Sequence, residues 1–319
     1  MSASRKVRHK VVADIGGRQS YTTNACRIVE KSEAPGMAVR SQPTARQVRL
    51  GIELRKMREA AGLTAREAAE RVGTTSAQMS HVEAGRTGVS EERLRGMATY
   101  YACLDDALID ELVAMAAERD KGWWEEHRGT LAHAALDLAE LEHRSRRLRT
   151  FQGVYIPGLL QVENYTRALM AYGVPQPSTR QLDALVAFRM RRREVLEGES
   201  PPAYEAVVHE AALRTLVADR EVARQQLAFV LEQGERSGIT VRVVPFDAEG
   251  FGGVGTPVLY AYGPVPRLDT VHIDVPHGPI LLDAESQLAR YRVFLDKALA
   301  FSLSAERSQE FIHTIMRQL

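Results

Sequence analysis

The sequence predicts two folded units of different class, a helical domain followed by a mixed α/β domain. Its 319 residues correspond to roughly two domains of typical size. Between about residue 46 and residue 119, apolar residues recur at helical spacing. From residue 149 onward, short β-branched runs alternate with helical patterns. Hydrophobic residues make up 45% and charged residues 26% of the chain, as in ordinary globular proteins.

Several protein classes are disfavoured by composition. No apolar run approaches the roughly 20 residues that a membrane-spanning helix needs. The basic start lacks the apolar stretch of a secretory signal. The two cysteines, Cys26 and Cys103, are too few for a disulfide scaffold. We therefore expect a cytoplasmic protein without a membrane partner.

Residues 1–45 predict a mobile basic arm. Glycines and prolines interrupt any regular period there, and Met37 is an alternative start for translation. Residues 1–49 carry ten Lys or Arg against three Asp or Glu, although the whole chain has a net charge of only +1. A basic front end favours a polyanionic partner, while a solvated tail is the plainer explanation.

Residues 46–119 predict five short helices. Leu50, Leu54 and Met57 form the apolar stripe of the first, and Leu108 and Leu112 that of the fifth. Hydroxyl residues suited to cap a helix N-terminus precede the second, third and fourth helices: Thr64, Thr75 and Ser90. Glycines that can end a helix follow the first three: Gly62, Gly73 and Gly85.

Residues 120–148 predict a helical connector, in which Trp123 and Trp124 pack one domain against the next. Residues 149–319 predict a mixed α/β domain with a regulatory or partner-binding role. Strands that follow one another directly favour a mixed sheet over a parallel one. The expected strands are 150–156, 203–210, 239–246, 256–262, 270–275 and 278–282. The expected helices are 157–173, 179–197, 218–236, 284–300 and 304–318.

Residues 64–85 form a helix, a tight turn and a second helix, the construction that lets a short helix enter the major groove of DNA. Met79 and Val82 would lock this second helix to the domain. Gln78 suits an adenine edge, and Ala77 a thymine methyl group. The residues predicted to contact DNA bases or phosphates are Thr64, Arg66, Thr75, Ser76, Ala77, Gln78, Ser80, His81, Arg86 and Thr87. The alternative from spacing alone is a helical bundle without nucleic acid.

The segment LRKMREAAGLTAREAAERVGTTSAQMSHVEAGRTGVSEERLRGMATYY resembles the five-helix, lambda-repressor-like domain of XRE-type (Cro/repressor-like) regulators. The resemblance implies a double-stranded DNA operator and transcription regulation. Two positions depart from the family pattern, Ala65 where glutamine is usual and Val89 where proline is usual. Because one motif covers only a half-site, we expect a homodimer on a palindromic operator.

The rest of the chain resembles the domain that follows the helix-turn-helix in actinobacterial regulators of the WhiJ-like kind. The matching stretches are 156–169, 188–196, 207–214, 225–246 and 288–312. This resemblance implies an antitoxin-like arrangement with a small companion protein. One alternative is a C-terminal domain that senses a small molecule, and a second is an enzyme domain tethered to DNA.

The sequence contains only weak motifs for cofactor or metal binding. Gly250, Gly252 and Gly255 match a dinucleotide fingerprint, but a strand-like run follows in place of the required helix. The polar residues near the end of the predicted sheet, which metal ligation or plain strand ends could explain, are His272, Asp274, His277 and Asp283. We expect no cofactor, no metal and no enzymatic activity.

Overall fold

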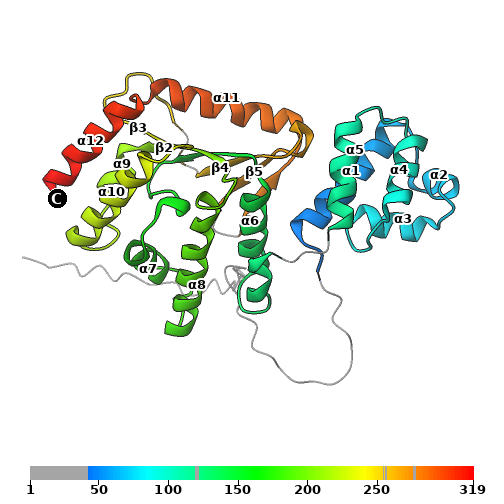
Figure 1. Ribbon diagram of the computed structural model, residues 1–319, viewed down its shortest axis with the longest axis horizontal. Coiled ribbons are helices and arrows are strands. Elements are labelled where there is room, and N and C mark those ends of the chain that lie inside the picture. The colour runs from blue at the N-terminus through cyan, green and yellow to red at the C-terminus, as the bar shows by residue number, and fades with distance from the viewer. Residues whose placement is uncertain (1–41, 119–121, 254, 256, 276–277) are drawn as a thin grey trace, which may run out of the picture.

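The computed structural model describes residues 42–118, 122–253, 255, 257–275 and 278–319. The chain folds into a helical bundle beside a mixed α/β domain, as predicted (Figure 1). Most of the expected arm over residues 1–45 lies outside the described residues, as does His277.

Five helices build the bundle, and their ends follow from local sequence. They are α1 (Ala45–Ala60), α2 (Ala65–Arg71), α3 (Ser76–Glu83), α4 (Glu91–Tyr100) and α5 (Asp106–Ala117). Thr64 caps α2 as predicted, because its Oγ1 accepts from the Glu67 amide at 3.2 Å and the Glu67 carboxylate accepts from the Thr64 amide at 2.8 Å. The glycines after α1, α2 and α3 all adopt positive φ, which ends each helix.

The bundle core contains residues from both domains. Leu54, Met79 and Leu94 are fully buried among the five helices. Leu268, which follows the bundle by more than 150 residues, is buried in the same cluster, and Val265 packs against it. The C-terminal domain therefore completes the core of the bundle.

The C-terminal domain contains both α-helices and strands. Its strands are β1 (Arg147–Gln152), β2 (Ala203–His209), β3 (Ile239–Val244), β4 (Val258–Tyr262), β5 (Thr270–Ile273) and β6 (Ile280–Leu282). Its α-helices are α6 (His133–Arg144), α7 (Glu163–Ala171), α8 (Thr179–Arg192), α9 (Glu210–Arg214), α10 (Arg220–Gly234), α11 (Glu285–Phe301) and α12 (Ala305–Gln318). Short 3-10 turns are η1 (Trp123–His127), η2 (Gly158–Leu160), η3 (Arg193–Leu196) and η4 (Pro266–Leu268).

The sheet is mixed, as predicted. In the described residues its strand order is β3-β2-β1-β4-β5-β6. The β1–β2 and β2–β3 pairs are parallel, and the other three pairs are antiparallel. Helical segments connect the parallel strands because a parallel pair needs a crossover. The edge strand β3 is partly covered by α12, since Ser308 Oγ accepts from the Val243 amide at 3.0 Å.

Helices cover both faces of the sheet (Figure 1). On one face, Leu288 and Leu295 of α11 pack over Phe151 and Tyr260. Helices α6, α7, α8 and α10 lie on the other face, where Leu148 belongs to a second apolar cluster. Because side chains alternate along a strand, β1, β2, β3 and β4 each contribute to both clusters, whereas β5 contributes to the α11 side.

Three sequence-based expectations need correction. The helix expected from residue 157 begins as a 3-10 turn, and α7 starts only at Glu163, because the intervening residues 161–162 have extended backbone. The first strand begins at Arg147, three residues before the expected position. Trp123 packs on Phe188 of α8, with ring centroids 5.0 Å apart, and Trp124 joins the same cluster. The two tryptophans thus pack η1 and α6 against α8 inside the C-terminal domain, and they do not join the two domains. Helix α1 contacts the C-terminal domain from the bundle.

Candidate nucleic-acid interface

Helix α3 has one buried face and one exposed face. Met79 and Val82 are only 1% and 5% exposed and fix the helix to the bundle core. His81 is half-buried. The other residues predicted to contact DNA are all exposed, and they lie at the start of α2, on α3 or next to the ends of α3: Thr64, Arg66, Thr75, Ser76, Ala77, Gln78, Ser80, Arg86 and Thr87.

Hydrogen bonds define the N-terminal turn of α3. Thr75 Oγ1 accepts from the Gln78 amide at 3.2 Å and caps the helix. The Gln78 side chain instead accepts from the Thr74 hydroxyl. A bidentate contact with adenine uses both atoms of the side-chain amide. The bond from Thr74 uses one of the two acceptor positions of the Gln78 side-chain oxygen, so the other position and the side-chain N–H groups remain available to a base.

Two arginines lie where phosphate contacts were predicted, Arg66 in the first turn of α2 and Arg86 just after α3. Arg66 pairs with Glu70 at 3.1 Å, and both side chains are largely exposed. Exposed pairs of this kind contribute little to stability, so the guanidinium can exchange the carboxylate for a phosphate. Arg86 follows the end of α3, and its backbone amide donates to the His81 carbonyl at 2.9 Å. Its exposed side chain makes no hydrogen bond or ion pair within the described ranges.

A buried ion pair orients α3 on α1. Arg58 Nε lies 2.6 Å from Glu83 Oε1, and Arg58 Nη2 lies 3.0 Å from Glu83 Oε2. The hydrogen bond to Glu83 raises the pKa of Arg58. Arg58 also donates to the Leu63 carbonyl at 2.6 Å, which ties down the segment before α2. Since Glu83 is the single acidic residue of α3, this pairing leaves the exposed face of the helix without a free carboxylate.

The end of α3 touches the backbone of α1. A Cβ on Gly51 would lie 2.4 Å from the Glu83 carbonyl oxygen, and one on Gly85 would lie 2.6 Å from the Gln47 carbonyl oxygen. Gly85 also has a φ of 70°, which disfavours other residues. Sequence reasoning missed Gly51. A glycine inside a helix is costly, and that cost is the signal that could have revealed this close contact.

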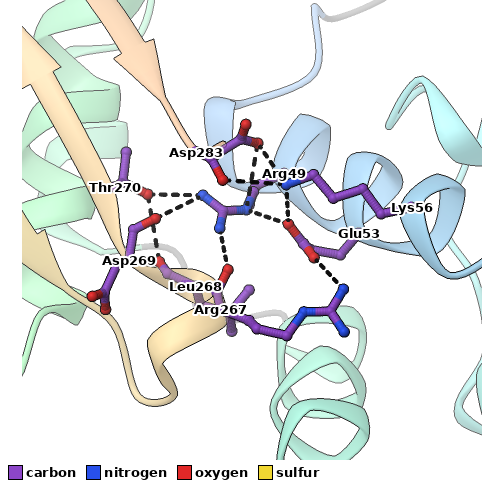
Figure 2. A network of polar contacts seen from close by, with 8 residues as sticks. All are labelled: Arg49, Glu53, Lys56, Arg267, Leu268, Asp269, Thr270 and Asp283. Carbon is purple, nitrogen blue, oxygen red and sulfur yellow. Dashed lines mark hydrogen bonds and ion pairs between the residues drawn. The ribbon is translucent and has the colours of Figure 1, made fainter. Parts of the chain in front are cut away.

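The opposite face of α1 carries a polar network that joins the two domains (Figure 2). Glu53, only 1% exposed, lies 3.0 Å from Arg49, 2.8 Å from Lys56 and 3.4 Å from Arg267. Arg49 also donates to Thr270 Oγ1 at 3.0 Å. Three basic side chains thus share one buried carboxylate, and this network fixes α1 against the β5 end of the sheet.

The candidate metal and dinucleotide motifs of the sequence lie outside the bundle, and their residues have other neighbours in the structure. Within the described residues, no group of three or more His, Cys, Asp or Glu side chains is placed to hold a metal ion. Asp283 instead pairs with Lys56 at 3.5 Å. Strand β4 follows the glycine-rich segment that begins at Gly250, where a dinucleotide site requires a helix. Among these same residues, no helix is long and apolar enough to cross a membrane.

The bundle with its exposed, rigidly held α3 defines a helix-turn-helix DNA-binding protein. Residues 49–112 match the family described as a helix-turn-helix domain. Residues 135–314, more than half of the chain, match the family described as a domain of unknown function (DUF5753), and the chain belongs to this family. No curated protein and no solved structure matches the chain. The combination supports an XRE-like DNA-binding regulator.

Proposed function

We propose that this protein is a cytoplasmic, sequence-specific transcriptional regulator that binds its operator through α3 and has no catalytic activity. The observation that carries the proposal is the exposed polar turn Ser76–Gln78 on a helix whose other face is locked by Met79 and by the Arg58–Glu83 pair. A recognition helix needs this combination of a free outer face and a fixed inner face.

The dimensions of DNA favour a dimeric form. The first turn of α3 would enter the major groove, which is about 12 Å wide, while Arg66, Arg86 and Thr87 would meet the phosphates on either side. One copy then reads a half-site. A homodimer would read two half-sites about 34 Å apart, or a multiple of that spacing, on a palindromic operator.

The test is selection of an operator from random DNA, followed by binding measurements on the variant Gln78→Ala. We expect this variant to bind the selected operator about 1–3 kcal/mol more weakly and to lose preference at one base position. Gln176→Ala, an exposed glutamine on the C-terminal domain, is the matched control and should bind like the wild type.

Two outcomes would contradict this assignment. Equal loss of affinity on every sequence would move Gln78 from base reading to backbone contact. If no sequence were enriched at all, a helical bundle without nucleic acid would be the better account. Specific binding should also weaken steeply with salt, because phosphate contacts release counterions.

For the C-terminal domain, we infer a WhiJ-like, antitoxin-like role in which a small companion protein delivers the regulatory signal. The supporting observation is the resemblance carried by residues 188–196 and 288–312. The test is affinity purification of the tagged full-length chain from its native host, with mass spectrometry of the eluate. A stoichiometric small protein supports the arrangement, and its absence from a DNA-competent preparation contradicts it.

A second candidate is direct sensing of a small molecule. It is favoured by a cavity of about 630 Å³ within the C-terminal domain. Cavities of this size are typical of small-molecule sites. A ligand that changes operator affinity without any companion protein would favour this candidate.

A further inference from the structure

The C-terminal cavity lies under the sheet, between α6 and α8, and reaches β5. Much of its wall is apolar, including Leu138 of α6, Leu159 of η2 and Leu259 of β4. Arg189 and His272 also line it. The cavity thus offers a large apolar surface with a few polar groups.

Two arginines of α8 line this cavity, and they differ in their partners. Arg192 forms two hydrogen bonds with Glu142 of α6, at 2.9 and 2.6 Å, and both side chains are buried. The two charges cancel, and the paired geometry is the strong form of arginine–carboxylate contact. Arg192 is therefore already satisfied by the protein itself.

Arg189 has no such partner. Its Nη1 donates to the neutral Gln161 Oε1 at 2.9 Å, and its Nε is buried without any hydrogen bond. In the part of the chain that the structure describes, no carboxylate lies within 4.0 Å of this guanidinium. The Arg189 side chain is half-buried, and a charge that is partly removed from water is costly unless a group of opposite sign faces it.

The surroundings leave the charge of Arg189 in place. Burial and the nearby Arg192 lower the pKa of Arg189 to about 10, so the guanidinium stays protonated at neutral pH. Asp274 also lines the cavity and opposes this lowering of the Arg189 pKa, but its side chain is 71% exposed and lies 3.8 Å from His272. Water screens that exposed carboxylate, and it forms no ion pair with Arg189, so it compensates the charge of Arg189 only weakly.

We propose that this cavity binds a small organic carboxylate, whose carboxyl group pairs with Arg189 and whose apolar body packs against Leu138, Leu159 and Leu259. One uncompensated charge fits a monoanion, and the planar guanidinium fits a planar carboxylate. The apolar walls disfavour a compact, strongly hydrated ion. This site specifies the class of ligand for the small-molecule sensing proposed above. Its regulatory role rests on that proposed function.

The test uses the full-length protein and two pairs of probes in titration calorimetry, octanoate with octanamide and 4-phenylbutyrate with its amide. We expect at least one carboxylate to bind once per chain, and at least tenfold more tightly than its amide. Arg189→Met should weaken that carboxylate at least tenfold and leave the amide unchanged. Arg180→Met, an exposed arginine on the same helix, is the matched control and should bind like the wild type.

The proposal is overturned if neither carboxylate binds, if carboxylate and amide bind equally, or if Arg189→Met binds like the wild type. The comparison of acid with amide is made in the wild-type protein, so it decides the matter even if Arg189→Met fails to fold. Binding is measured without DNA. A failure here is therefore distinct from a failure of the Gln78 experiment, which tests DNA reading alone.

Discussion

Two cavities formed by the described residues lie on either side of α6, and their charges are arranged differently. The cavity between the domains, about 840 Å³, is lined by Arg46, Arg49 and Arg144. Each of these pairs with a carboxylate: Arg46 with Glu118 at 2.8 Å, Arg49 with Glu53 at 3.0 Å, and Arg144 with Glu118. In the C-terminal cavity, Arg189 has only a neutral partner. Charges that are paired within the chain indicate a structural contact, whereas a half-buried charge that faces a cavity without a carboxylate indicates a ligand site.

The strongest challenge to this comparison is Glu53→Gln. This change leaves Arg267 without a carboxylate, and it leaves Arg49 and Lys56 with Asp283 alone, at 3.7 and 3.5 Å. The free energy of unfolding should fall by about 3 kcal/mol, as for other broken buried pairs. The measurement is chemical denaturation at pH 7. Glu59→Gln is the matched control, because Glu59 pairs with Arg55 on the exposed side of the same helix, and it should change little. Similar losses in both variants would show that the interdomain network contributes no more to the free energy of unfolding than an exposed ion pair does.

A second challenge removes the apolar part of the same contact. Leu268→Ala should lower the free energy of unfolding by roughly 2–3 kcal/mol, because it leaves a hole in the core of the bundle. Leu104→Ala, in a side chain that is 92% exposed, should be close to neutral. If truncating Leu268 were also neutral, the bundle core would not depend on the C-terminal domain.

The variant Arg189→Met tests the same comparison at the C-terminal cavity. Replacing this half-buried charge, which lacks a carboxylate partner, by an apolar residue of similar length should leave the free energy of unfolding unchanged or slightly raised. The Gln161 oxygen keeps a hydrogen bond from Thr166 at 3.2 Å, so the change orphans no acceptor. Thermal and chemical denaturation without ligand measure the effect. A large loss would assign Arg189 to the scaffold.

The smallest expected effect is a pH dependence from His272. Burial lowers the pKa of His272, with Asp274 opposing and Arg192 adding to the shift. The unfolded chain therefore binds this proton at higher pH than the folded chain, and stability should fall as the pH drops below about 6.5. His272→Asn should make the free energy of unfolding fall less between pH 7 and 5.5. Equal slopes in both proteins would contradict this assignment.

Local chemistry explains which features could be predicted from the sequence. The cap at Thr64 and the stop at Gly73 depend on neighbours within a few residues, and the structure has both. The bond from Arg49 to Thr270 joins residues 221 positions apart, and no local pattern encodes it. Arg189 is similar, because a run of arginines does not reveal which member turns inward and lacks a carboxylate. The predicted DNA contacts stay predictions, although the exposed face that they require is present.

Strand β5 spans both regions of the molecule. Thr270 accepts the hydrogen bond from Arg49, and His272, two residues along and on the same face of the strand, lines the C-terminal cavity. The two positions are only roughly 7 Å apart along one strand. A ligand that shifts β5 would therefore act on α1, to which the Arg58–Glu83 ion pair holds α3. Linkage then makes the coupling reciprocal: any factor by which a ligand changes operator affinity is the factor by which the operator changes ligand affinity.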